Sequence, residues 1–166
     1  VDKKKAARAL ARFVSLHPHN IAQKTEVMIE HFHHFTRHKI GGKAKAMVVT
    51  SSRLHAVRYK EEFDKYIANN GYSDIKTLVA FSGMVIDPDL RDKTYTEVGM
   101  NEGIKEKELP KKFDGGEYQV LIVAEKYQTG FDQPLLHTMY VDKLLAGVQA
   151  VQTLSRLNRT NPGKED

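Results

Sequence analysis

Two arginines near the carboxyl end of the chain, in the segment QTLSRLNR, have a type and spacing suited to phosphate chemistry. The spacing predicts a helix over residues 148–158, on which Gln152, Arg156 and Arg159 share one face. Guanidiniums fixed side by side on a packed helix present permanent, forked positive charge to phosphate oxygens. The same spacing also fits a solvated basic face, or two arginines paired with nearby carboxylates.

Four short apolar runs, separated by helical patterns, must position these residues. The runs predict strands at 45–52, 77–83, 120–124 and 138–141. Helical patterns occur around and between them, at residues 2–16, 20–40, 53–69 and 105–113. Strands that alternate with helices predict the α/β class, with a mostly parallel sheet and helices on both faces. In such sheets, ligands bind beyond the carboxyl ends of the strands.

Individual residues set the expected boundaries of these elements. Pro18 stops the first helix, and Asn20 is the expected N-cap of the second, which Gly41-Gly42 ends. Asn70-Gly71 closes the helix that starts near Arg53. Residues 84–104 are polar, contain glycine and show no clear periodicity, so we expect an inserted loop there.

The composition is that of an ordinary globular domain with a basic tilt. The chain has 166 residues, of which 40% are hydrophobic and 28% charged, and this fits one domain with a buried core. The net charge of +5 favours an anionic partner such as nucleic acid or a nucleotide. The absence of cysteine excludes a disulfide scaffold, a thiolate metal site and a cysteine nucleophile. No apolar run is long enough to span a membrane, so we expect a cytoplasmic protein without a membrane partner.

Four segments together resemble the second RecA-like domain of superfamily 2 helicases and translocases. QTLSRLNR resembles their motif VI, with Ser155 in place of the usual glycine, and KYQTGFD (126–132) resembles motif V. VVTSSR (48–53) resembles motif IV, and AFSG (80–83) resembles the short motif that follows it. More narrowly, residues 43–163 resemble the motor (R) subunit of type I restriction enzymes. The resemblance implies a RecA-like three-layer fold, that of a helicase C-terminal domain.

The resemblance also implies half of an ATP site. Arg159 would be the arginine finger at the terminal phosphate, with Arg156 beside it, and Gln152 would orient this cluster or couple it to DNA. Gly130 would let the backbone approach the nucleotide, and Asp132 would accept a hydrogen bond from a ribose hydroxyl or sense the bound state. A simple turn is the alternative explanation of Gly130 and Asp132.

By the same resemblance, the loops after the first two strands face the nucleic-acid backbone. Their hydroxyls, amides and one cation suit phosphate contacts, which carry no sequence information. The residues are Thr50, Ser51, Ser52, Arg53, Ser82 and Gly83. Capping of the following helix and a turn of the chain are the alternatives. Motif V departs from the family pattern because its usual threonine falls at Ala124, and whether Thr129 replaces it stays open.

We divide the chain into a helical lead-in, residues 1–42, and a RecA-like domain, residues 43–166. Because the chain begins with Val1 rather than Met, we expect a fragment of a longer polypeptide. No G-x-x-x-x-G-K-[ST] phosphate loop occurs, so we expect ATP and Mg²⁺ in the full-length subunit only, and an inactive isolated fragment that binds neither. The implied partners are double-stranded DNA, an upstream RecA-like domain and a nuclease domain of the same polypeptide, and the modification and specificity subunits.

Three other functions fit parts of the sequence. Another superfamily 2 DNA or RNA helicase would carry the same motifs and act on a different substrate. A non-catalytic nucleic-acid-binding module would use only the basic surface. A small metalloprotein would use the crowded histidines His31, His33, His34 and His38, the last two of which have the i, i+4 spacing of zinc ligands but no acidic third ligand nearby.

Overall fold

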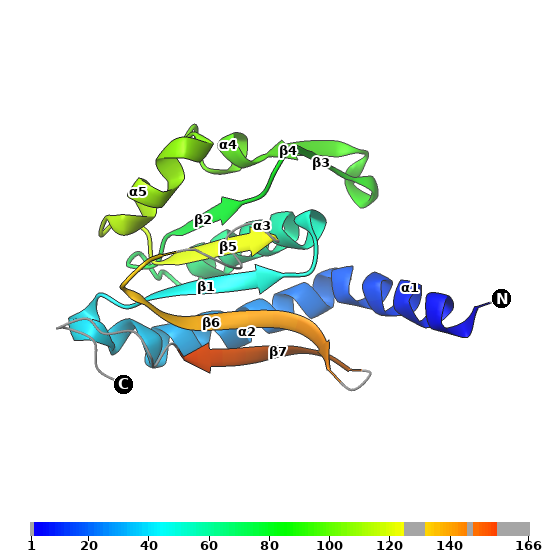
Figure 1. Ribbon diagram of the computed structural model, residues 1–166, viewed down its shortest axis with the longest axis horizontal. Helices are drawn as coiled ribbons and strands as arrows, with labels where there is room; N and C mark the ends of the chain where they lie inside the picture. The colour runs from blue at the N-terminus through cyan, green and yellow to red at the C-terminus, as the bar shows by residue number, and fades with distance from the viewer. Residues whose placement is uncertain (1, 125–131, 146–147, 156–166) are drawn as a thin grey trace.

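A five-stranded sheet forms the centre of the protein (Figure 1). The computed structural model describes residues 2–124, 132–145 and 148–155. In sheet order the strands are β2 (Thr77–Ala80), β5 (Val120–Ala124), β1 (Lys45–Thr50), β6 (Leu136–Leu145) and β7 (Val148–Ser155). The first four are parallel to their neighbours, and β7 runs antiparallel to β6. The predicted α/β class with a mostly parallel sheet is confirmed, and the architecture is consistent with a RecA-like fold.

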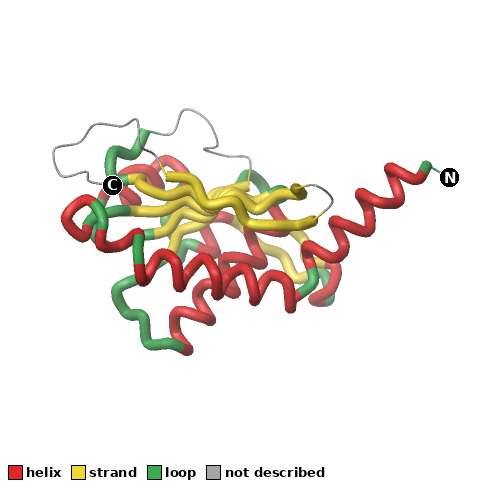
Figure 2. The backbone as a smooth tube through the Cα atoms, turned by 90° about the horizontal axis from the view of Figure 1, so that it is seen from below, coloured by secondary structure: helices red, strands yellow, loops and turns green. Residues whose placement is uncertain are grey.

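Helices pack against both faces of this sheet. The long helices α2 (Pro18–His34) and α3 (Arg53–Asn69) lie together on one face (Figure 2), where they form a single apolar core with the strands. On the other face, α5 (Leu109–Asp114) buries Leu109 and Phe113 against apolar residues of β2 and β5. All residues of β5 are buried, as expected for a central strand covered on both faces.

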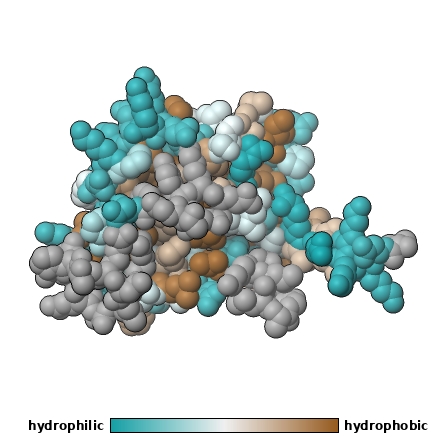
Figure 3. All heavy atoms as spheres, in the orientation of Figure 1, coloured by the Kyte–Doolittle hydropathy of each residue, from teal (hydrophilic) through white to brown (hydrophobic). Residues whose placement is uncertain are grey.

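The two amino-terminal helices meet at a proline. α1 (Lys3–Leu16) projects from the body, and the face seen in Figure 3 is mostly hydrophilic at its outer end, while Leu10 and Phe13 of the same helix are also exposed. α1 stops before Pro18, whose ring cannot continue a helix. Pro18 instead begins α2, where its missing N–H is not needed. The prediction that Asn20 caps α2 is wrong. The cap is His17, whose Nδ1 accepts from the His19 N–H at 3.1 Å, while the Asn20 amide donates to a carbonyl of α1.

The other predicted helix ends are partly confirmed. α3 begins at Arg53 and ends at Asn69, with Gly71 following in a left-handed conformation (φ +66°). α2 ends at His34, earlier than the predicted glycine pair. Two 3₁₀ turns, η1 (Thr36–His38) and η2 (Ile40–Gly42), connect it to β1.

Residues 84–104 are ordered secondary structure, so the prediction of an inserted loop is wrong. They form the hairpin β3 (Met84–Asp87) and β4 (Lys93–Thr96), with η3 (Pro88–Leu90) at its tip, and the short helix α4 (Glu97–Met100); η4 (Glu106–Glu108) then precedes α5. The hairpin buries Val85 and Tyr95 in the main core. Asn101, just after α4, then satisfies backbone groups of the edge strand β2. Its side chain accepts from the Val79 N–H at 2.9 Å and donates to the Val79 carbonyl at 2.7 Å. The sequence does not predict this hairpin because four-residue strands are too short to show a periodicity and because the contacts that stabilise them are non-local.

The predicted helix over residues 148–158 is also wrong as far as the structure describes it. Residues Val148–Ser155 form β7, whose partners on β6 run from Leu145 back to Thr138. The segment contains valines and a threonine that favour a strand, and Val151 packs on the main core while its neighbour Gln152 pairs with Val141. Arg156 and Arg159 lie outside the described residues. The helical face predicted for them and Gln152 is therefore not seen in the described part of the segment.

The amino-terminal helix α2 and the sheet share one core, although the division at residue 43 stays a prediction. Ile21, Met28, Ile29 and Phe32 of α2 belong to the same buried cluster as β1 and β5. Among the described residues, no helix combines the length and the apolar character that crossing a membrane requires.

We predict that Phe32→Ala destabilises the whole chain by about 3–5 kcal/mol, because Phe32 is fully buried between α2 and the sheet and its removal leaves a cavity. Urea unfolding of the chain, followed by circular dichroism and by tyrosine fluorescence, measures this. The matched control is Val27→Ala on the solvent side of α2, where the side chain is 63% exposed and we expect a change within about 0.5 kcal/mol. Two separate transitions would show that α2 does not fold with the sheet.

Candidate nucleic-acid interface

The loops that follow β1 and β2 lie side by side at the carboxyl edge of the sheet. β5 separates the two strands, and both Val49 and Ala80 pair with its Val123, so the strands end at nearly the same level. The loop 51–52 leaves β1 there, and the loop 81–83 leaves β2. The structure therefore brings together the two groups of residues that the sequence predicts at the nucleic-acid backbone.

The residues of the first loop divide into buried and exposed groups. Thr50 is buried, and its hydroxyl lies 2.9 Å from the Val123 carbonyl oxygen and 3.1 Å from that of Ser52, so it serves the fold. Ser52 caps α3 by accepting from the His55 N–H at 3.2 Å. Ser51 and Arg53 are exposed, and these two side chains are the ones available to a ligand.

Arg53 connects the first loop to the second. Its Nη1 donates to the carbonyl oxygen of Ser82 at 2.8 Å and lies 3.4 Å from that of Met84. Gly83, between these two residues, has φ +70°, and a Cβ placed there would lie 3.2 Å from the same nitrogen. A side chain at this position would therefore be strained and would crowd the guanidinium.

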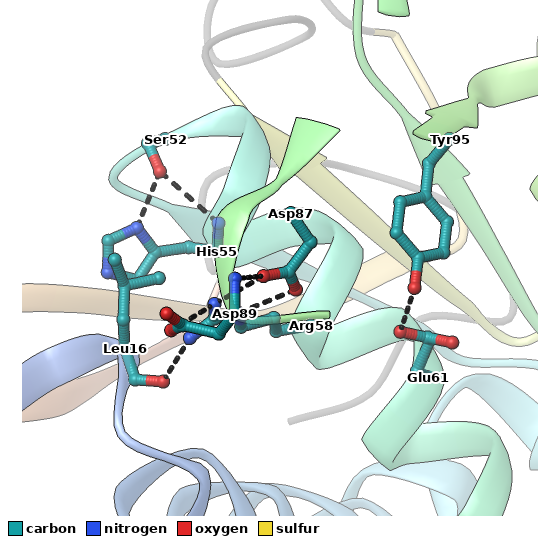
Figure 4. A network of polar contacts seen from close by, with 8 residues as sticks. All are labelled: Leu16, Ser52, His55, Arg58, Glu61, Asp87, Asp89 and Tyr95. Atoms are coloured by element: carbon teal, nitrogen blue, oxygen red, sulfur yellow. Dashed lines mark hydrogen bonds and ion pairs between the residues drawn. The ribbon is translucent and has the colours of Figure 1, made fainter. Parts of the chain in front are cut away.

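A buried histidine, which the sequence analysis missed, anchors this edge to α1. The His55 Nδ1 lies 2.6 Å from the Ser52 hydroxyl and its Nε2 lies 2.8 Å from the Ser15 hydroxyl (Figure 4 shows the Ser52 contact). Ser15 donates to the Arg12 carbonyl, so its oxygen accepts from Nε2–H, and Nδ1 accepts from Ser52. Burial lowers the pKa of His55 to about 4, which keeps the ring neutral at pH 7. In the sequence, the one signal for the Ser52–His55 contact is their Ser-x-x-His spacing.

A second missed group holds the β3–β4 hairpin on α3. Arg58 donates from Nε and Nη2 to both carboxylate oxygens of Asp87, at 3.1 and 2.7 Å, and from Nη2 to Asp89 at 2.9 Å (Figure 4). Its Nη1 also donates to the Leu16 carbonyl at the end of α1, at 2.7 Å. Burial acts to raise the pKa of Asp87, but the bonds and charge of Arg58 together with the bond from the Asp89 N–H outweigh it and hold the pKa below its ordinary value. No sequence signal pairs these residues, which lie 29 positions apart.

Of the two predicted nucleotide-binding residues, Gly130 lies outside the described residues, as does the predicted nucleic-acid contact Thr129. Asp132 is described, and it is exposed. It precedes Gln133, which donates to Asp114 at the end of α5, and Leu135, whose carbonyl accepts from the Lys45 N–H at 2.8 Å. Because Lys45 begins β1, Asp132 lies toward the amino edge of the sheet, opposite the loops 51–53 and 81–83.

Gln152 is placed differently from its prediction. It is half-buried on β7, opposite Val141, which in turn pairs with Val49. Gln152 is therefore level with the end of β1 but two strands away, while Ser155 at the end of β7 is level with Ala46 at the other edge.

Three of the four clustered histidines make side-chain contacts within the fold. The His31 Nδ1 lies 2.7 Å from the Tyr140 hydroxyl, His33 stacks on Tyr72, and the His34 Nε2 lies 3.1 Å from Glu30. In the described part of the chain, no three potential metal ligands of the types His, Cys, Asp or Glu come together.

The mostly parallel sheet, the helices on its faces and the paired loops at its carboxyl edge define a RecA-like α/β domain. Residues 89–166 match the family model of type I restriction enzyme subunit R domain 3. We conclude that the chain belongs to the R subunits of type I restriction enzymes.

Relatives with the same family description cover most of the chain. The "Putative type I restriction enzyme MjaVIIP endonuclease subunit" of Methanocaldococcus jannaschii is 30% identical over 177 aligned positions, covering 99% of this chain and 16% of the relative. The type I restriction enzyme HindI endonuclease subunit of Haemophilus influenzae is 27% identical over 149 positions, covering 84% of this chain and 13% of the relative. The chain thus spans 13–16% of the length of these two relatives.

We predict that His55 makes the stability of the chain sensitive to acid. Below about pH 6.5 the unfolded chain binds a proton at this ring, whereas the folded chain does so only near pH 4. Folding therefore loses on the order of 3 kcal/mol as the pH falls through this window. The free energy of unfolding in urea, measured from pH 8 to pH 4, should show the advantage of the wild type over His55→Gln shrinking by about that amount.

The control for this measurement is His19→Gln, which removes an exposed histidine. The difference between wild type and this control should stay nearly constant over the same pH range. Parallel curves for wild type and His55→Gln would contradict the buried, neutral ring.

Proposed function

We propose that the chain is the second motor domain of an ATP-dependent DNA translocase within a type I restriction enzyme. The observation that carries the proposal is the meeting of two loops, 51–53 and 81–83, at the carboxyl edge of the sheet, with exposed hydroxyls and one guanidinium between them. Ligands of parallel α/β sheets bind at this edge. The membership of the chain in the R-subunit family supports the choice of DNA as the ligand.

In this proposal the loops hold the phosphate backbone of double-stranded DNA. Ser51 and Ser82 supply exposed hydroxyls, and the backbone at Gly83 approaches closely because no side chain is present. Contacts of this kind position a duplex without reading its bases, as a translocase that moves along any sequence requires. Recognition of a particular sequence would belong to the specificity subunit, and methylation to the modification subunit.

The ATP half-site of the proposal depends on the motif resemblance of the carboxyl-terminal segment. Arg159 and Arg156 would meet the phosphates of an ATP held by an upstream domain of the full-length subunit. Gln152, which lies on strand β7, would keep its motif VI role only without the shared helical face. Gly130 and Asp132 would contact the nucleotide from the same domain. Magnesium would accompany ATP in the cleft. The described residues contain no group of three metal ligands, so we assign the ion no ligand there.

Movement would follow from closure of the cleft between the two motor domains. Nucleotide contacts bias an equilibrium between open and closed arrangements, and hydrolysis releases the bias. Because the loops 51–53 and 81–83 hold the backbone, each cycle would shift this domain along the duplex. A nuclease domain elsewhere in the enzyme would then cut the DNA.

We predict that Arg159→Ala in the full-length subunit lowers DNA-stimulated ATP turnover by about 10³-fold or more, since an arginine finger stabilises charge that develops only in the transition state. Affinity for duplex DNA should change little. A steady-state phosphate-release assay and fluorescence anisotropy measure the two quantities. Arg8→Ala, which removes an exposed arginine of α1, is the charge-matched control. Unchanged turnover in Arg159→Ala would favour a non-catalytic nucleic-acid-binding module.

We predict that Ser82→Asp weakens binding of duplex DNA by about tenfold, because it adds negative charge next to a phosphate. The control is Ser73→Asp, an equal change at an exposed serine near the amino edge of the sheet, which should leave affinity unchanged. Titrations with duplex DNA, single-stranded DNA and RNA compare the substrate classes. A variant that loses affinity only for RNA would indicate a different superfamily 2 helicase.

A further inference from the structure

The side chain of Arg53 is bound to the main chain of the neighbouring loop. Its Nη1 donates to the Ser82 carbonyl at 2.8 Å, with a second, longer approach to the Met84 carbonyl at 3.4 Å. Within the described residues, Arg53 takes part in no ion pair, so no carboxylate holds it there. Part of the hydrogen-bonding capacity of the guanidinium therefore holds loop 81–84 in its observed conformation.

Gly83 fits this contact in two ways. Its φ of +70° lies in the left-handed region, which turns the chain so that the carbonyls on either side face Arg53. The space where its Cβ would stand is 3.2 Å from Nη1, which is tighter than an ordinary contact. Arg53 and Gly83 thus form one local arrangement, although they lie 30 positions apart in the sequence.

Hydrogen bonds to α3 hold this arrangement on both sides. Arg53 is the first residue of α3, and Ser52 caps the same turn while bonded to the buried His55. Beyond the loop, Arg58 and Glu61 hold the hairpin to later turns of α3, through Asp87 and Tyr95. α3 therefore fixes the chain from residue 82 to residue 95 at three places, and Arg53 is the one closest to the exposed serines.

We infer that Arg53 is a positioning residue for the nucleic-acid contacts: it holds loop 81–84 in the geometry that binds a backbone phosphate, and this is its main contribution to affinity. The inference rests on the proposed function. Both carbonyls lie near one nitrogen, Nη1, whose direction a planar guanidinium fixes more tightly than a freely rotating ammonium would. A loop that is already ordered in the free protein loses less conformational entropy when it binds. Affinity therefore rises without an added phosphate contact.

The dependence of affinity on salt separates positioning from direct contact. Each phosphate neutralised on duplex DNA contributes about 0.9 to the slope of log affinity against log salt concentration. For Arg53→Gln in the full-length subunit, we expect binding of a duplex without a recognition sequence to weaken by about tenfold at every salt concentration, with an unchanged slope. A slope that falls by about 0.9 would show a direct phosphate contact and overturn the inference.

Two further variants test the geometry. Arg53→Lys keeps the charge but replaces the planar guanidinium by a shorter side chain with a rotating ammonium, so we expect nearly the same loss as in Arg53→Gln. Full affinity in Arg53→Lys would overturn the inference. Gly83→Ala should weaken binding similarly, and the double variant Arg53→Gln with Gly83→Ala should be no weaker than either single variant. Additive losses would mean that the two residues act separately and would also overturn it.

The controls separate this inference from the proposed function. Arg91→Gln removes an exposed arginine at the tip of the same hairpin and should leave affinity and slope unchanged. Unfolding free energies measured for every variant show whether a loss of affinity merely follows a loss of stability, which would overturn the positioning role. If Ser82→Asp leaves binding intact, the proposed DNA interface fails; if Ser82→Asp weakens binding while Arg53→Gln lowers the slope, only the positioning role fails.

Discussion

The carboxyl edge of the sheet depends on the polar contacts that α3 makes along its first three turns. Arg58 is the centre of these contacts, because its guanidinium joins the end of α1 to the β3–β4 hairpin through a carboxylate that is only 1% exposed. Loss of one partner from such a pair leaves a buried charge without compensation, at a typical cost of about 3–5 kcal/mol. The same helix carries His55 toward α1 and Arg53 toward the loop after β2. One rigid helix therefore sets the positions of two exposed loops and one hairpin.

Much of this architecture can be predicted from local sequence patterns. The valine-rich runs that form β1 and β5 carry a strong signal because they are buried on both faces, and the bounds of α3 follow from a capping serine and a closing Asn-Gly pair. β7 cannot be assigned in the same way. Its apolar residues fit a helical stripe as well as a strand, and the pairing with β6 that decides the matter involves residues distant in sequence. The β3–β4 hairpin escapes prediction for a related reason, since the contacts that stabilise it are non-local: Val85 and Tyr95 pack in the main core, and Arg58 bonds Asp87.

The candidate interface shows the same division between local and non-local information. That the loops after β1 and β2 meet at one edge follows from parallel topology, so Ser51, Arg53, Ser82 and Gly83 could be grouped from the sequence. Their different roles could not be predicted. Thr50 looks like its neighbour Ser51 in the sequence, yet it points into the sheet and bonds the Val123 carbonyl. The partners of Arg53 are main-chain oxygens, which no residue pattern identifies.

Under the proposed function, the placement of Asp132 and of the serines at opposite edges bears on how the domain would couple the two proposed ligands, nucleotide and DNA. β1 has six residues, so the two edges are about 16 Å apart at the rise of an extended strand. Between them lie strands whose side chains are buried and closely packed, and such a core transmits displacement without deforming. Contacts made with a nucleotide at one edge would therefore move the loops at the other edge only if the domain turned as a rigid body. The attachment of loop 81–84 to α3 meets this requirement. A loop that moved independently of the domain would not pass the domain's displacement on to the proposed DNA ligand.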